Sequence, residues 1–182
     1  MCWVALDRAC RLADAGQLPA RHLSRWRREA AAIREFVETE CWSARKQSYV
    51  RFAGSEELDA SLLMLAIDRY HDPRHPRIVS TVDVVKRELG RGPLLYRYMG
   101  ADGLSGGEGL FMCCSFWLVE ALALMGRREE AARMLDEVLA LANDVGLYAE
   151  EIDPESRDFL GNFPQALVHL ALISAAVALA QR

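Results

Sequence analysis

Residues 120–144, EALALMGRREEAARMLDEVLALAND, predict two helices joined by a tight turn. Apolar residues recur every three or four positions on both sides of Gly126, which is the spacing of helices that bury one face. Glycine often follows a helix end, because it adopts the left-handed backbone at no steric cost. The helix before the turn, from Phe111 to Met125, is apolar nearly all round and is therefore expected to be buried on both sides.

The same helical spacing continues outward from this hairpin through most of the chain. The expected helices run from Trp3 to Gly16, Leu23 to Val37, near Glu56 to Ala66, Val79 to Leu89, Phe111 to Met125, Glu129 to Ala142 and Pro164 to the end. The segment SYVRF (48–52) alternates like a short strand or an extended loop. Tight turns and long loops alternate between the helices, and long loops on one side of a rigid array usually carry the functional site. We therefore expect an all-α domain without a sheet, either an α/α toroid or a helical solenoid.

The composition fits one globular domain of 182 residues and narrows the classes of partner. The formal net charge of −4 argues against a nucleic acid or an anionic membrane as a general partner. No apolar stretch is long enough to cross a bilayer, and the most apolar one contains His169. Five cysteines without C-x-x-C spacing indicate free thiols in a reducing compartment, so we expect a cytoplasmic location.

We expect neither a metal site nor a cofactor. His71 and His75 are four residues apart, but Pro73 and Pro76 break the helix that would bring both rings to one metal ion. The glycine-rich segment 94–109 lacks the Gly-Lys-Ser/Thr ending that a phosphate-binding loop requires.

The same segment, 94–109, carries residues suited to binding a sugar. Arg97 stands between two tyrosines, one of them Tyr98, and precedes a loop that contains Asp102 and Glu108. Arginine donates hydrogen bonds to sugar hydroxyls, carboxylates accept them, and tyrosine rings stack on sugar faces. A solvated loop with an ordinary salt bridge explains the same residues equally well.

A second polar loop, GLYAEEIDPESRDFLGN (146–162), holds the adjacent carboxylates Glu150 and Glu151. Hydrolysis of a glycosidic bond uses one carboxylate to remove a proton from water and another to protonate the leaving oxygen. Successive side chains of an extended segment point to opposite faces, so only one of the two can address a given site. The alternative is a solvated acidic loop that also includes Asp153 and Glu155.

Six motifs, in order, are MCWVALDRA, GSEELDASLL, YRY followed by DGLSGGEG, CSFWLVEALALMGR, LANDVGLYAEE and LGNFPQALVHLALI. Together they resemble the catalytic domain of glycoside hydrolase family 15, the bacterial glucoamylase-like and trehalase-like enzymes. The resemblance covers essentially the whole chain. It implies part of an (α/α)6 barrel of the six-hairpin glycosidase type, in which the predicted helices match the sixth to the twelfth of twelve.

The resemblance also implies roles for individual residues. Glu150, in the segment AEEID, matches the general base of the family. Five further residues would bind or surround the sugar: Arg97, Tyr98, Glu108, Trp117 and Glu151. Trp117 is the least specific of these, because aromatic residues at helical spacing are more often part of the core.

The family's reaction is inverting hydrolysis of an α-glucosidic bond in starch, maltooligosaccharides or trehalose, which releases glucose. Its general acid lies in a Trp-Glu motif shortly before the segment that matches MCWVALDRA. This chain begins inside a helical pattern with no residue to cap it. We therefore expect residues 1–182 to be the C-terminal portion of the catalytic domain, inactive or nearly so alone, and completed by the missing N-terminal half in cis or in trans.

Two alternatives to a glycosidase fragment stay open from the sequence. One is a sugar-binding remnant that has lost catalysis. The other, less favoured, is a helical-repeat interaction module, because residues 120–144 resemble one tetratricopeptide-type hairpin. No second copy follows at the period of about 34 residues that such repeats keep.

Overall fold

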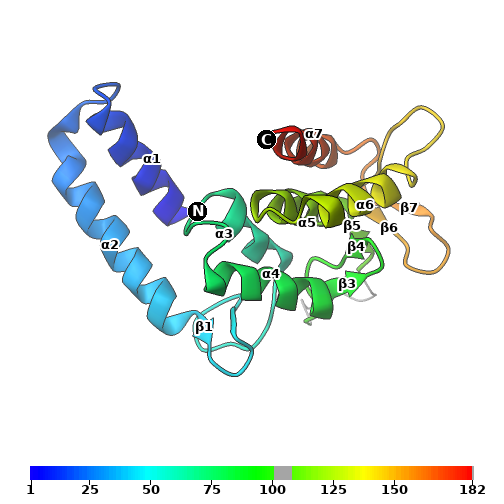
Figure 1. The fold of residues 1–182 in the computed structure, drawn as a ribbon, viewed down its shortest axis with the longest axis horizontal. Helices are drawn as coiled ribbons and strands as arrows, with labels where there is room; N and C mark the ends of the chain where they lie inside the picture. The colour runs from blue at the N-terminus through cyan, green and yellow to red at the C-terminus, as the bar shows by residue number, and fades with distance from the viewer. Residues whose placement is uncertain (101–107, 182) are drawn as a thin grey trace.

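The chain is mostly helical in a computed structural model that describes residues 1–100 and 108–181. The helices are α1 (Cys2–Asp14), η1 (Ala20–His22), α2 (Leu23–Glu40), η2 (Ala60–Leu63), α3 (Met64–Ile67), α4 (Pro76–Leu89), α5 (Met112–Leu124), α6 (Arg128–Leu139) and α7 (Ala166–Ala180), where η marks a 3-10 helix. Short strands lie between them: β1 (Trp42–Ser43), β2 (Ser48–Tyr49), β3 (Gly90–Arg91), β4 (Leu94–Leu95), β5 (Leu110–Phe111), β6 (Glu151–Ile152) and β7 (Phe159–Leu160). Figure 1 shows their arrangement.

Helix α5 forms the centre of the hydrophobic core. Helices α6 and α7 both pack against it, and η2, α3 and α4 contact it as well. Nearly every side chain of α5 is buried, and Cys113, Cys114 and Phe116 have no exposed surface. A helix that is apolar on all sides is stable only when other elements surround it. The burial expected for this segment from its sequence is therefore confirmed.

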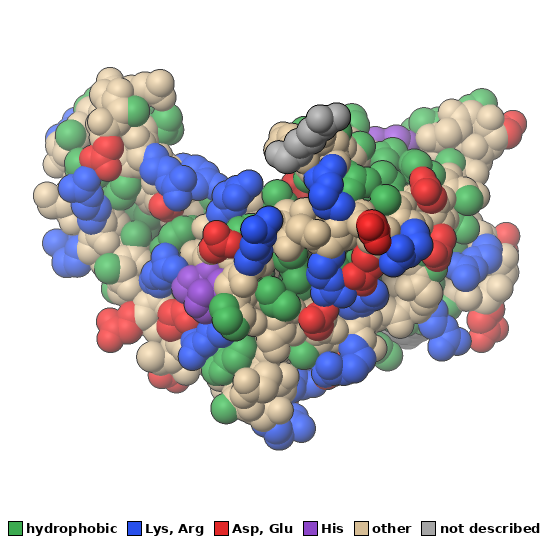
Figure 2. All heavy atoms as spheres, in the orientation of Figure 1, with side chains coloured by type: hydrophobic (Ala, Val, Ile, Leu, Met, Phe, Trp, Pro, Cys, Tyr) green, Lys and Arg blue, Asp and Glu red, His purple; other side chains and the backbone are tan. Residues whose placement is uncertain are grey.

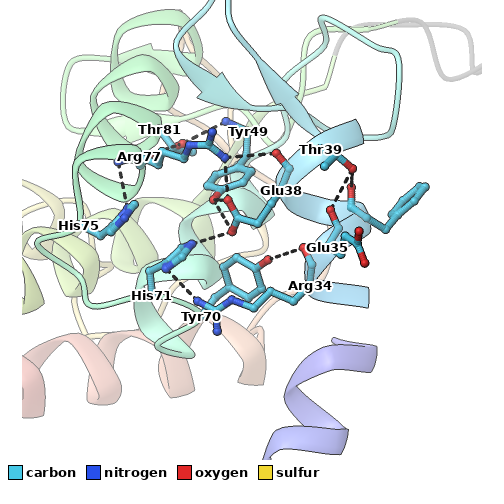
Figure 3. Close-up of polar contacts among 11 residues, drawn as sticks. Arg34, Glu35, Glu38, Thr39, Tyr49, Tyr70, His71, His75, Arg77 and Thr81 are labelled. Carbon is cyan, nitrogen blue, oxygen red and sulfur yellow. Dashed lines mark hydrogen bonds and ion pairs between the residues drawn. The ribbon is translucent and has the colours of Figure 1, made fainter. Parts of the chain in front are cut away.

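Helices α1 and α2 form a hairpin that projects from the rest of the fold (Figure 1), and polar side chains attach it. Glu38 on α2 accepts hydrogen bonds from the Tyr49 hydroxyl at 2.9 Å and from Arg77 Nη1 at 2.7 Å. Its carboxylate also pairs with His71 Nε2 at 2.6 Å, and Arg34 Nη2 lies 2.9 Å from His71 Nδ1. Figure 3 shows these groups converging on Glu38 from separate elements. We call Glu38, Tyr49, His71 and Arg77 the Glu38 cluster.

Small antiparallel ladders connect the long loops. Strand β1 pairs with β2, and β3 pairs with β4. Strands β5, β6 and β7 form a three-stranded ladder in which Glu151 lies opposite both Phe111 and Leu160. Strands of two residues are too short to show the alternation that identifies a strand in a sequence. The expectation of a fold without any sheet is therefore wrong in the loops, although the mostly helical class is right.

Two helices begin later than the sequence predicts, because a side chain caps each of them. The third predicted helix was expected from near Glu56, but the chain is not helical before Asp59, whose carboxylate accepts from Ser61 N at 2.8 Å. Helix α7 begins at Ala166, because the side chain of Gln165 accepts from Leu167 N at 3.3 Å. Such caps bond the backbone N–H groups that the first turn of a helix leaves unpaired.

One face of α7 is apolar and exposed. Leu170, Ile173 and Val177 are 63%, 60% and 50% exposed, whereas Val168 and Ala171 on the other side are buried. That other side packs against α5. In the space-filling view, an open notch separates the end of α7 from the α1–α2 hairpin (Figure 2). Apolar faces of this kind mark contact surfaces in soluble proteins.

Candidate active site

Glu150 lies immediately before β6, between a buried anchor and a backbone ladder. Tyr148 and Ala149, which precede it, are 1% and 0% exposed. Its carbonyl accepts a hydrogen bond from Met112 N at 3.0 Å, at the start of α5. Its own N–H donates to the carbonyl of Asn162 at 2.9 Å, shortly before α7. The backbone of Glu150 is therefore held from both sides, by segments that lead into the two most closely packed helices.

Among the described residues, Asn162 holds the carboxylate of Glu150, and it does so at one oxygen. Oε2 accepts from the side-chain Nδ2 of Asn162 at 2.7 Å and from its backbone N at 3.2 Å. Within the described part of the chain, no hydrogen bond reaches Oε1. Gly161, beside Asn162, has φ +73°, and a Cβ there would lie 3.0 Å from both Cβ and Oε2 of Glu150. Glycine fits this position for two reasons, its left-handed backbone and the close approach of Glu150.

Glu151, the next residue, bonds to a different segment. Its Oε2 accepts from the backbone N of Gly109 at 2.9 Å. A Cβ at Gly109 would lie 2.8 Å from that oxygen, 3.0 Å from Cβ of Glu151 and 3.1 Å from the carbonyl of Ile152. The two carboxylates thus take partners from different parts of the chain, as expected for successive residues of an extended segment.

Arg97 and Glu108 form the charged pair of the site. The Nη2 atom of Arg97 bonds to the carboxylate of Glu108 and donates to the Tyr98 hydroxyl at 2.9 Å. The guanidinium carbon also lies 4.7 Å from the ring centre of Tyr98 and 5.1 Å from that of Phe111, within the range of cation–π contacts. Burial acts to lower the pKa of Arg97, but Glu108 outweighs this effect and raises the pKa, so the guanidinium stays charged.

Two buried atoms of this charged pair have no hydrogen-bond partner among the residues that the structure describes. They are Arg97 Nε, a donor, and Glu108 Oε2, an acceptor. Buried polar atoms without a protein partner are uncommon and usually bond to water or to a ligand. A sugar hydroxyl, which both donates and accepts, matches this combination of atoms.

Gly109 connects the charged pair to the carboxylates of β6. It follows Glu108 in the chain and donates its N–H to Glu151. Four of the residues predicted around the sugar therefore lie together, on β6 and on the segments that flank β4 and β5: Arg97, Tyr98, Glu108 and Glu151. Glu150 lies at the edge of the same ladder.

Of the other two residues, one packs against the hydrophobic core and one lies outside the described residues. Trp117 on α5 is partly buried and packs against the hydrophobic core. Asp102 lies outside the described residues. Conversely, sequence reasoning assigns no role to Asn162 or Gly161. The signal that could have found them is the turn LGNFP before the last helix, since a glycine followed by a polar residue there can approach a neighbouring backbone closely.

Other kinds of site find no support in the residues described. Across 1–100 and 108–181, no group of three or more His, Cys, Asp or Glu side chains is arranged to hold a metal ion. The five cysteines are free thiols. In the same residues, no helix is both long and apolar enough to span a bilayer.

Comparison with known proteins gives a consistent result. The family model described as Glycosyl hydrolases family 15 matches residues 1–177. A trehalase of Mycobacterium tuberculosis is 44% identical over 180 residues, and one of Thermoplasma volcanium is 40% identical over 177 residues. Each alignment covers 97% of this chain, but only 26% and 28% of the two relatives.

Solved structures share the fold over most of the chain. A wild-type glycosidase superposes with a TM-score of 0.79 at 24% identity, and a glycosidase variant in complex with glucose superposes with a TM-score of 0.82 at 22% identity. These matches cover 91% and 97% of this chain, and 47% and 49% of the solved chains. The chain thus spans about half the length of the solved structures and between a quarter and a third of the curated relatives.

Proposed function

The chain belongs to glycosyl hydrolases family 15, and on that premise we propose that it carries the general base, Glu150, of a trehalose-hydrolysing enzyme. The reaction is inverting hydrolysis of an α-glucosidic bond, which releases glucose. Trehalose is favoured over starch or maltooligosaccharides because the similar curated proteins are trehalases.

The way in which Glu150 is held is the observation that carries this proposal. A base for water needs a negatively charged carboxylate with an oxygen available to take the proton. Asn162 fixes Oε2 with neutral donors, and no described residue bonds to Oε1. Glu150 therefore has one oxygen for orientation and one for chemistry.

In the proposed mechanism, Glu150 removes a proton from water as the water oxygen attacks the anomeric carbon. A carboxylic acid on the other face of the sugar protonates the leaving oxygen, and in inverting enzymes the two groups are about 6.5–9.5 Å apart. Glu151 is adjacent in the chain and bonded to Gly109, so it does not fit the role of the acid. We propose that the acid comes from a segment outside residues 1–182.

The Arg97–Glu108 pair is proposed to hold the sugar next to Glu150. Arg97 would donate to sugar hydroxyls and Glu108 would accept from them, and each has a buried atom available for this. Tyr98 accepts a hydrogen bond from Arg97 at its hydroxyl, and its ring contacts the guanidinium groups of Arg51 and Arg97, so it would help to orient Arg97 beside the sugar. Glu151 would keep Gly109, and with it Glu108, in place, and Trp117 would line the pocket from α5.

We further propose that residues 1–182 form the C-terminal portion of an (α/α)6 barrel of the six-hairpin glycosidase type. The solved glycosidases are about twice as long as the segment that they share with this chain, and the exposed face of α7 offers a surface for further helices. The N-terminal half would supply them in cis or in trans. Without the acid, activity should fall by about 10²–10⁴-fold, so the chain alone is expected to be inactive or nearly so. A cytoplasmic location stays a prediction from the free cysteines.

A second candidate is a sugar-binding remnant without catalysis. The charged pair that would bind the sugar lies entirely within this chain, whereas no acid has been identified in it. A helical-repeat module is set aside, because the family match runs from residue 1 to residue 177.

The proposed function is tested by joining residues 1–182 to the N-terminal part of a trehalase relative and measuring glucose release from trehalose, maltose and starch. We expect hydrolysis of trehalose by the joined protein and none by either part alone. Saturable trehalose binding without turnover would favour the remnant. Glucose release from starch but not from trehalose would overturn the proposed substrate.

A further inference from the structure

We propose that Asn162 is the positioning residue of the general base, and that Gly161 provides the space that this contact needs. The inference rests on the proposed role of Glu150. It extends that role by assigning a residue that would act on the reaction only through the carboxylate that it holds.

Backbone hydrogen bonds alone hold Asn162 beside Glu150. The N–H of Glu150 donates to the carbonyl of Asn162 at 2.9 Å, and the N–H of Gln165 donates to the carbonyl of Tyr148 at 3.0 Å. The two segments that carry these residues are thus tied at both ends. Since Tyr148 is almost fully buried, the pair of segments is anchored to the core.

The hydrogen bonds from Asn162 then fix the direction of the carboxylate. Both its side-chain Nδ2 and its backbone N reach the same oxygen of Glu150, at 2.7 and 3.2 Å. Two donors on one oxygen restrict rotation of the carboxylate about its last bond, so Oε1 points away from Asn162. Both bonds lie near the surface, where water competes, and the main gain is therefore orientation rather than stability.

A neutral donor suits a base better than a charged one. An arginine or lysine at this position would also hold the carboxylate, but its positive charge would weaken the affinity of the carboxylate for a proton. An amide donor orients the group at a smaller cost in basicity. The neutral amide of Asn162 is therefore a suitable donor to a carboxylate that acts as a base for water.

Gly161 gives independent support for a built contact. Its φ of +73° is a conformation that residues with a side chain rarely adopt. A Cβ there would lie 3.0 Å from Cβ and from Oε2 of Glu150, so any side chain would push the carboxylate away from Asn162. The position combines a left-handed backbone with a close approach to one functional group.

The kinetic test uses the joined protein described above with Asn162→Ala. We expect kcat on trehalose to fall roughly 10- to 100-fold, the range expected when a hydrogen bond to a charged group is lost, with KM within about two-fold. Asn162→Asp should lower kcat further, because it places a second negative charge against Glu150. Asn143→Ala is the matched control: Asn143 caps a turn of the same loop, accepting from Val145 N and Leu147 N, without touching Glu150. This control should leave kcat unchanged.

A second measurement needs no activity and uses residues 1–182 alone. The side-chain carboxyl ¹³C resonance of Glu150 is assigned by its loss in Glu150→Gln and recorded at one pH. We expect Asn162→Ala to change its chemical shift, because the two hydrogen bonds at Oε2 change, and Asn143→Ala to leave it in place. If Asn162→Ala does not fold, Asn162→Ser, which retains a shorter donor, replaces it and should give a smaller shift.

The two proposals fail in different ways. An active Glu150→Gln variant would overturn the proposed function, and with it the role of Asn162. An inactive Glu150→Gln variant combined with a wild-type kcat and an unchanged Glu150 carboxyl resonance for Asn162→Ala would overturn the present inference alone.

Discussion

Two glutamates of this chain, Glu38 and Glu150, are held in opposite ways. Both oxygens of Glu38 are occupied, since Oε1 pairs with His71, Oε2 accepts from Arg77, and the Tyr49 hydroxyl lies 2.9 Å from each. Burial acts to raise the pKa of Glu38, but the hydrogen bonds from His71 and Tyr49 outweigh it and lower the pKa. Glu150 has Asn162 as its partner, at Oε2.

The difference separates a structural carboxylate from one that can take part in a reaction. Glu38 joins the α1–α2 hairpin to β2 and α4 (Figure 3), so its bonding capacity is used in holding elements together. Among the described residues, Glu150 is held firmly at its backbone and at one carboxylate oxygen, Oε2. Whether a carboxylate is structural or catalytic is therefore indicated by whether its partners leave one oxygen available. How firmly the residue is anchored is a weaker guide.

Replacing Glu150 with Gln should give the largest effect, and on activity alone. In the joined protein we expect kcat on trehalose to fall by about 10²–10⁴-fold, because the base is lost while shape and sugar contacts remain. Trehalose binding, measured by calorimetry, should stay within a few-fold of the wild type. Glu151→Gln, at the neighbouring position, is the matched control and should lower kcat less. A Glu150→Gln variant that keeps most of its kcat would contradict the assignment of Glu150 as the reactive carboxylate.

Replacing Glu38 with Gln should give the reverse pattern. Removal of the charge leaves Arg77 without its ion-pair partner, and we expect the free energy of unfolding to fall by about 1–3 kcal/mol. The loss is moderate because the Glu38 side chain is 25% exposed, so water screens part of the ion pair. Urea unfolding of residues 1–182 measures this, with Glu150→Gln as a control that should change stability by less than about 0.5 kcal/mol. Equal losses in the two variants would contradict the distinction.

The Glu38 cluster should also make stability depend on pH. Burial lowers the pKa of His71 against the opposing effect of Glu38, and Arg34 and His75 lower it further. As the pH falls, His71 in the unfolded chain, with its ordinary pKa of 6.5, binds a proton at a higher pH than His71 in the folded chain. Stability therefore falls as the pH drops below about 6.5. The lowered pKa of Glu38 adds a loss that begins near its ordinary value of 4.5.

Urea midpoints between pH 7.5 and 5 measure the contribution of His71. We expect the wild type to lose on the order of 1 kcal/mol over this range and His71→Asn to lose less, because the titrating ring is gone. A His71→Asn variant with the same pH dependence as the wild type would assign the loss to other groups.

A third glutamate, Glu120 on α5, should give the smallest effect. It is 8% exposed, and burial raises its pKa although a hydrogen bond from Ser174 partly opposes this. Its ionised form therefore disfavours folding, so stability is fully present below about pH 4.5 and is lost as the pH rises through the raised pKa. We expect Glu120→Gln to raise the free energy of unfolding at pH 7 by about 0.5 kcal/mol, and to have no effect at pH 4. A loss of stability at pH 7 would instead show that ionised Glu120 is well satisfied.

Much of the helical architecture could be predicted, because helical periodicity is local. The buried helix α5 and the turn at Gly126 both follow from residues 120–144 and the segment before them. The ladder β5–β6–β7 could not be predicted, since each strand is two residues long and the β5–β6 pairing joins distant positions, as in Phe111 opposite Glu151. The caps at Asp59 and Gln165 move helix starts by a few residues, which periodicity does not resolve.

At the candidate site, the residue types were predictable but their partners were not. Arg97, Glu108 and the two carboxylates stand out in the sequence by charge and position. The partners Gly109 and Asn162 act through backbone groups and one amide, and the turn LGNFP around Asn162 marks a close approach without showing which carboxylate it meets. The spacing of His71 and His75 suggests only a metal site, whereas in the structure their rings stack 4.2 Å apart and the His71 ring bonds to Glu38, a residue 33 positions away.

The β5–β6–β7 ladder has a consequence for how this chain can change in length. Side chains on a strand alternate between the two faces of a ladder. A slip of one residue in the pairing therefore turns every side chain of that strand to the opposite face. A single deletion between Tyr148 and β6 would bring Glu151 to Asn162 and remove the carboxylate that accepts from the N–H of Gly109. The turn between Asp153 and Asp158, where Asp153 N bonds to the carbonyl of Asp158, lies beyond the paired residues. Insertions should therefore be tolerated in that turn and be disruptive a few residues earlier.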